Sequence, residues 1–197
     1  MKKKNLLTLF VILAIIILYW NSSWSQEYKE YKKAIANPKP ITNSLVWENT
    51  NKVKVYNNCI TALHLQGFEL EPLMTSKESG LIVTRPANFY PPIWQHNWIG
   101  GEYYLNVLVY ENDTTKISIN IQIKGTKLYN YEPDDKGGFK RFEVQNGDNK
   151  NIGRYKPSEV WNGLTIKVSE DIEQFLSKLE PIQGKPVSKT TKMLNWE

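Results

Sequence analysis

The sequence is poor in the residues that usually carry catalysis and metal binding. It has one cysteine and two histidines in 197 residues. The lone Cys59 has no C-x-x-C partner for a metal or a disulfide, and the histidines do not stand at zinc-binding spacing. The nucleophile motif G-x-S-x-G and a phosphate-binding glycine loop are also missing. The sequence therefore indicates no catalytic residues, no metal ligands and no cofactor. We expect Cys59 to be buried as a small apolar residue; the alternative is an exposed reactive thiol.

The sequence also lacks a strong excess of either positive or negative charge. The formal net charge is +5, but Lys2, Lys3 and Lys4 supply three of the 25 basic residues. Without residues 1–25, 22 basic side chains stand against 20 acidic ones, a net charge of +2. This near-neutral balance argues against a nucleic-acid-binding protein.

Residues 1–25 have the layout of a secretory signal. Three lysines precede an apolar run over residues 6–20, and small polar residues follow it. The run is shorter than the roughly twenty residues of a spanning helix. We expect cleavage between Ser25 and Gln26 and an extracytoplasmic, periplasmic location. In the first alternative, the apolar run is retained as an inner-membrane anchor, with Trp24 at the membrane interface. In the second, the protein is cytosolic and the apolar run is buried in its core.

The rest of the chain predicts one domain between two polar segments. Residues 26–44 contain Pro38 and Pro40 and are typical of a linker. Residues 45–182 are expected to form the domain, and residues 183–197 a flexible tail. About 170 residues suit a single domain with one core.

Apolar spacing predicts two helices. One covers residues 51–66 and ends at Gly67, which suits the left-handed conformation of a helix C-terminus. Its apolar stripe consists of Val53, Tyr56, Cys59, Ile60 and Leu63. The other covers residues 158–179, with a firm start near Ser169 because Gly163 and Thr165 are poor helix formers. Pro181 is expected to follow its end.

Strand-forming residue types and the alternation of apolar with polar residues predict the strands. Residues 81–84 and 103–110 are rich in strand formers, and Asn112-Asp113 makes a turn before residues 116–124. There the isoleucines 117, 119, 121 and 123 alternate with polar residues, which indicates an antiparallel strand with one face in water. Together with a minor strand over residues 139–144, the pattern predicts an α+β fold. We expect a two-layer sandwich in which an antiparallel sheet of about four strands packs against two helices.

Residues 52–179 resemble the helix-grip, or TATA-binding-protein-like, domains of BamC-type envelope lipoproteins. The resemblance lies in a helix that ends in a Gly-aromatic step, a charged turn and a "GLI-T" strand. The matching residues are Ala62, Leu65, Gly67, Phe68, Gly80, Leu81, Ile82 and Thr84. The chain departs from this family in having no lipobox cysteine and an aromatic segment over residues 87–101. The resemblance implies a non-enzymatic accessory role in envelope protein assembly, and it supplies no functional residues.

The aromatic segment is the most unusual feature of the sequence. Phe89, Tyr90, Trp94 and Trp98 are combined there with two prolines, and such side chains are favoured in contact surfaces. We predict that these four residues bind a partner. The alternative is a loop that folds back and plugs one end of the sheet.

These observations predict an exported, non-catalytic accessory or binding protein of the cell envelope. Its expected partner is an envelope protein, with no nucleic acid, and the inner membrane is contacted through residues 6–20 if the signal is retained. One alternative is a module that binds carbohydrate or cell-wall glycan. Another is a small periplasmic enzyme whose site is not visible in the sequence.

Overall fold

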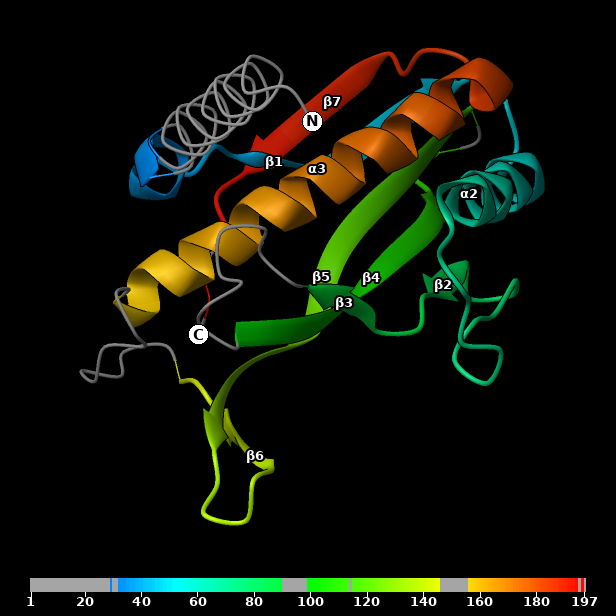
Figure 1. Ribbon diagram of the computed structural model, residues 1–197. Helices are drawn as coiled ribbons and strands as arrows, with labels where there is room; N and C mark the ends of the chain where they lie inside the picture. The colour runs from blue at the N-terminus through cyan, green and yellow to red at the C-terminus, as the bar shows by residue number, and fades with distance from the viewer. Residues whose placement is uncertain are drawn as a thin grey trace, which may run out of the picture. The chain divides into compact units, whose positions relative to one another are not determined.

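The computed structural model describes residues 29, 32–89, 99–113, 115–145, 156–194 and 196 (Figure 1). The chain divides into two compact units, residues 1–37 and residues 38–197, and the second contains the sheet. In the first unit, residues 32–36 are helical. The predicted signal over residues 1–25 lies outside the described residues. Within the described ranges, no helix is long and apolar enough to cross a membrane.

The second unit combines helices with one antiparallel sheet, so the predicted mixed fold class is confirmed. The predicted number of about four strands is wrong, because the sheet has seven. Their bounds are β1 (Ile41–Glu48), β2 (Leu81–Val83), β3 (Ala87–Phe89), β4 (Ile99–Glu111), β5 (Lys116–Pro133), β6 (Phe139–Glu143) and β7 (Ser188–Lys192). The order is β2-β4-β5-β1-β7, while β3 pairs with β4 and β6 with β5.

Two of the additional strands come from segments that the sequence predicted to be irregular. β1 begins at Ile41, inside the expected linker, and β7 lies inside the expected flexible tail. The two strands pair antiparallel, with Val46 opposite Ser188. All five residues of β7 are exposed, so it has no apolar alternation that a sequence pattern could reveal. Its lysines suit the edge of a sheet, where charge discourages pairing with other chains.

The central hairpin of β4 and β5 forms around the predicted turn, but β5 continues past its predicted end at residue 124 to Pro133, and Ser118 on the face expected in water is buried. Ile117, Ile119 and Ile121 are buried on one face of β5, while Ile123 is only partly covered. The turn is fixed by the Asp113 carboxylate, whose Oδ1 accepts the backbone N–H groups of Thr115 at 2.8 Å and Lys116 at 2.9 Å. The hydrogen bond from the Thr115 backbone lowers the pKa of Asp113. Hydrogen bonds between residues that are close in the sequence therefore set the register of this hairpin.

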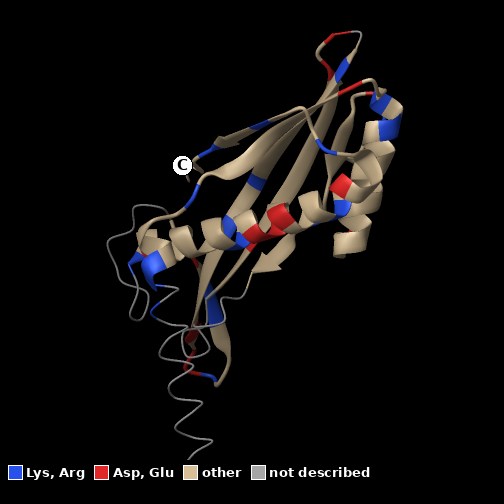
Figure 2. Ribbon diagram, turned by 90° about the horizontal axis from the view of Figure 1, so that it is seen from above, with Lys and Arg blue, Asp and Glu red and all other residues tan. Residues whose placement is uncertain are grey.

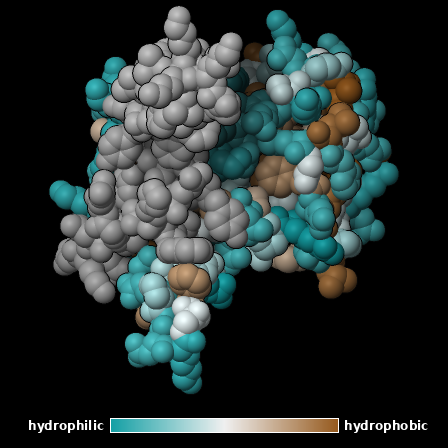
Figure 3. Space-filling view, in the orientation of Figure 1, coloured by the Kyte–Doolittle hydropathy of each residue, from teal (hydrophilic) through white to brown (hydrophobic). Residues whose placement is uncertain are grey.

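Helix α2 (Lys52–Gln66) has the predicted ends. Asn51 caps its N-terminus by accepting the Lys54 N–H, and Gly67 follows its last residue with φ 92°. The predicted stripe is displaced, however, because Val53 is 48% exposed whereas Val55 is buried. Figure 3 shows hydrophobic side chains scattered among hydrophilic ones on the described part of this face. The helix is turned so that residues 55, 56, 59, 62 and 63 face the core.

Helix α3 (Pro157–Gln183) is longer than predicted at both ends. Gly163 and Thr165 lie within it and are buried, so tertiary packing overrides their low helix propensity. Pro181 also lies inside the helix rather than after it, and Gly184 ends the helix instead. The expected firm start near Ser169 is therefore wrong, because the helix begins at Pro157.

The two helices contact each other, and each also contacts the sheet. α2 packs on β4, and α3 packs on β1 (Figure 1). Figure 2 shows acidic and basic residues side by side along α3. The C-terminal end of α2 lies against the middle of α3, where the Gln66 Nε2 donates to the backbone oxygen of Asp171 at 2.8 Å. This junction positions the candidate site.

Candidate functional site

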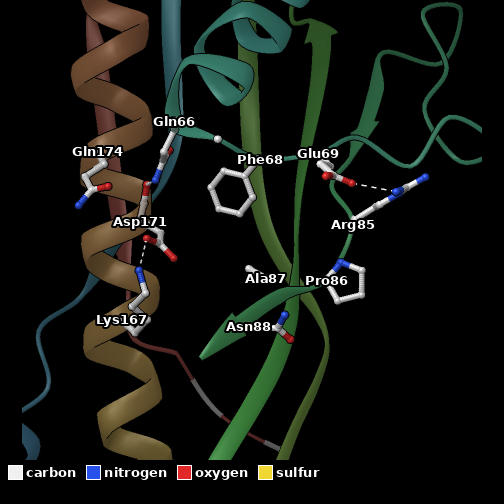
Figure 4. Close-up of a pocket in the computed structure, with 11 residues that line it drawn as sticks. Gln66, Phe68, Glu69, Arg85, Pro86, Ala87, Asn88, Lys167, Asp171 and Gln174 are labelled. Atoms are coloured by element: carbon white, nitrogen blue, oxygen red, sulfur yellow. Dashed lines mark hydrogen bonds and ion pairs between the residues drawn. The ribbon is translucent and has the colours of Figure 1, made fainter. Parts of the chain in front are cut away.

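A polar cavity of about 600 Å³ opens beside the junction of α2 and α3 (Figure 4). Its volume is in the usual range of small-molecule sites, roughly 300–1,000 Å³. We call two groups of lining residues the helix wall and the loop wall. The helix wall is Gln66, Lys167, Asp171 and Gln174; the loop wall is Glu69, Arg85, Pro86, Ala87 and Asn88, with Gly67 and Phe68 between the two.

The end of α2 determines where the two walls separate. Gly67 takes the left-handed conformation, and its N–H donates to the His64 carbonyl at 2.9 Å. The Phe68 N–H donates to the Leu63 carbonyl at 3.0 Å, which closes the helix in the usual way of a glycine C-terminus. The chain then leaves the helix axis, and Figure 4 shows the Phe68 ring between the helix wall and the loop wall.

The loop wall is held together by a backbone hydrogen bond and an ion pair between the same two residues. The Arg85 N–H donates to the Glu69 carbonyl at 2.7 Å. The side chains of the same two residues form an ion pair, with 2.8 Å between Arg85 Nη1 and Glu69 Oε2. Both side chains are largely exposed, at 55% for Arg85 and 73% for Glu69. Solvent therefore screens this pair, and its contribution to stability is small.

The helix wall carries a buried carboxylate with two partners. Asp171 is 6% exposed and accepts hydrogen bonds from the Tyr103 hydroxyl and from Lys167 Nζ. Tyr103 lies on β4 and is fully buried. Burial raises the pKa of Tyr103 strongly, and the neighbouring Asp171 charge raises it further. Tyr103 therefore remains protonated near neutral pH and acts as a donor to Asp171.

This arrangement favours binding over acid–base chemistry. The Asp171 oxygens are already engaged by the buried Tyr103 hydroxyl and the Lys167 ammonium group, which fix the position of the carboxylate. Tyr103 is covered, so its hydroxyl has no path to a ligand in the cavity. The lining is thus a fixed set of polar groups, which is the usual means of orienting a ligand.

The sequence did not reveal this cluster, although one signal was present. Asp171 stands between Val168 and Phe175 at helical spacing, so it lies on the apolar face of α3. A carboxylate on such a face requires a buried partner. The identity of that partner, Tyr103, could not be read from the sequence because it is 68 residues away in the chain.

Of the four residues predicted to bind a partner, the structure describes Phe89 alone. Phe89 is the last residue of β3, pairs with Gly101 of β4, and is 4% exposed. Tyr90, Trp94 and Trp98 lie outside the described residues, so their contact role stays a prediction. The neighbouring β3 residues Ala87 and Asn88 line the cavity.

The residues considered for other chemistry are separate from the cavity. Cys59 is buried, as predicted, and its burial raises the pKa of the thiol. His64 is exposed on α2. In the part of the chain that the structure describes, no three His, Cys, Asp or Glu side chains gather where they could hold a metal ion.

The chain matches no protein-family model and no curated protein sequence.

Proposed function

We propose that the protein is an exported, non-catalytic binding protein of the cell envelope, and that it binds through the cavity between the helix wall and the loop wall. The observation that carries this proposal is the Tyr103–Asp171–Lys167 cluster, because it fixes a carboxylate as a structural part of the cavity. A carboxylate held in this way is suited to orienting a ligand.

Three features of the chain support the proposal. The signal-like layout of residues 1–25 supports export. The cavity supports binding, because polar groups from α2, α3 and β3 converge there. The resemblance to BamC-type domains supports an accessory role in the envelope, with an envelope protein as one class of partner.

Export is tested with a reporter that is active only outside the cytoplasm. The reporter is fused after Glu30, so that it follows the apolar run over residues 6–20. We expect activity in intact cells and loss of activity when residues 6–20 are deleted. A reporter that is silent in the full fusion, with the protein recovered from the cytosol, would contradict the proposal.

Binding at the cavity is tested with a photo-crosslinking amino acid at Asn88 in living cells. Asn88 lies exposed on the loop wall, whereas the exposed Asn57 on α2 does not line the cavity and serves as the control position. We expect a discrete crosslinked product from position 88 and none from position 57. The same products from both positions, or none from either, would contradict binding at this site.

A further inference from the structure

We infer that the ligand of this cavity is a neutral saccharide, such as an oligosaccharide unit of a wall glycan; this inference rests on the proposed binding function. It follows from the charge of the lining, from the polar groups that remain for a ligand, and from the aromatic ring between the walls.

The first step is the charge of the lining. The lining contains two cationic side chains, Lys167 and Arg85, and two carboxylates, Asp171 and Glu69. Lys167 pairs with Asp171 and Arg85 with Glu69, and Arg85 Nε also lies 4.0 Å from Glu71 Oε2 outside the lining. The net charge of the lining is therefore zero. A ligand with a net charge would have to disrupt one of these pairs or leave its own charge without a partner, which is unfavourable. A neutral ligand fits without either cost.

The second step is the set of uncharged groups. The amides of Gln66, Asn88 and Gln174 line the cavity from both walls. Each side-chain amide supplies both donors and acceptors. Gln66 Oε1 is buried and accepts no hydrogen bond from the described residues, while the nitrogen of the same amide is already used. The exposed amides of Asn88 and Gln174 remain for a ligand, and they pair with groups that both donate and accept hydrogen bonds, such as hydroxyls.

The third step is Phe68. Figure 4 shows its ring between the helix wall, with Gln66 and Asp171, and the loop wall, with Glu69 and Arg85. An aromatic ring with polar groups on two sides suits a ligand that has an apolar face and a polar rim. A pyranose ring has this character, because its C–H groups form a face and its hydroxyl groups surround it. An apolar peptide side chain would instead require an apolar pocket, and the lining here is mainly polar in residue type.

The test uses the full chain purified in detergent and three soluble probes. The probes are a tetramer of N-acetylglucosamine, a tetramer of glucose, and a negatively charged tetramer of galacturonic acid. Binding is measured by calorimetry and by saturation-transfer NMR. We expect at least one neutral tetramer to bind and the charged tetramer to bind at least about tenfold more weakly. No binding of either neutral tetramer, or equal binding of the charged one, would overturn the inference.

Two variants locate the bound sugar, and a third is the matched control. Asn88→Leu removes a cavity amide, and Phe68→Leu removes the aromatic face. Each should weaken binding of the neutral tetramer by about tenfold, the equivalent of one lost hydrogen bond or stacking contact. Asn57→Leu makes the same side-chain change as Asn88→Leu outside the cavity and should leave binding unchanged. Circular dichroism melts confirm that each variant is folded.

The outcomes separate this inference from the proposed function. If neither neutral tetramer binds but position 88 still crosslinks to an envelope protein, the saccharide inference fails and the binding function stands. If position 88 also gives no product, both fail. If Asn57→Leu weakens sugar binding as much as Asn88→Leu does, the sugar is bound elsewhere and the inference is overturned.

Discussion

The two walls of the cavity contain similar charges in different surroundings. On the helix wall, Asp171 is buried and bound by Lys167 and Tyr103. On the loop wall, Glu69 and Arg85 form a pair that is more than half exposed at both side chains. A buried carboxylate that loses its partners has no water to replace them, whereas an exposed one does. The ion pair on the helix wall should therefore contribute substantially to the stability of the fold, and the ion pair on the loop wall very little.

The largest expected effect is that of removing the buried carboxylate. Asp171→Ala leaves the Tyr103 hydroxyl buried without its acceptor and removes the partner of Lys167. We expect a loss of about 3 kcal/mol in the free energy of unfolding, since breaking a buried charge network is costly. Urea titration followed by circular dichroism measures the change.

Glu69→Ala is the matched control on the loop wall. It removes a carboxylate from an ion pair of the same kind, but the pair is exposed. We expect a loss below about 0.5 kcal/mol. Equal losses for the two variants would show that burial does not distinguish the walls.

The sequence allows parts of each wall to be predicted. The C-terminal end of α2 was predicted because Gly67 is a local signal, and the β4–β5 hairpin because its turn and alternation are local as well. Both features form from neighbouring residues, so a pattern in the sequence is sufficient to find them.

The remaining features depend on residues far apart in the chain. β7 forms only because β1 offers it an edge, more than 140 positions away, and its exposed residues leave no pattern. α3 continues through Gly163 and Pro181 because the rest of the helix is packed on the core. The cavity itself joins residues from α2, β3 and α3, so no single segment could predict it.

A second prediction concerns Tyr103 and the dependence of stability on pH. Tyr103→Phe removes a hydrogen bond to a charged acceptor, and we expect a loss of about 1–2 kcal/mol near neutral pH. Burial raises the pKa of Tyr103, so the hydroxyl ionises in the unfolded chain at about pH 10 before it ionises in the folded one. Its contribution is therefore fully present below about pH 10 and is lost as the pH rises above that value.

The difference in unfolding free energy between the wild type and Tyr103→Phe measures this contribution directly. Effects of other tyrosines cancel in the difference, because both proteins contain them. Urea titrations at pH 8, 9, 10 and 11 should give a constant difference up to about pH 9 and a smaller one at pH 11. A difference that stays constant over the whole range would show that Tyr103 is not held in its protonated form by the fold.

Smaller effects than that of Asp171→Ala are expected when the cation of each pair is replaced. Lys167→Met and Arg85→Met each replace a long cation with a neutral side chain of similar shape. The Lys167 side chain is 35% exposed and its removal leaves Asp171 with Tyr103 alone, so we expect a loss of about 1 kcal/mol. The Arg85 side chain is 55% exposed, and its backbone hydrogen bond to Glu69 is unaffected by the change. For Arg85→Met we therefore expect a loss of no more than about 0.5 kcal/mol.

The dependence on salt concentration distinguishes the effects of Arg85→Met and Lys167→Met further. Added salt weakens exposed ion pairs but reaches buried ones poorly. Raising the salt concentration from 0.05 to roughly 0.5 M should remove most of the Arg85→Met effect and leave most of the Lys167→Met effect. If Arg85→Met costs more than about 1 kcal/mol and the cost persists at high salt, the exposed pair holds the loop wall in place. The contrast between the walls would then arise from backbone geometry rather than from burial of charge.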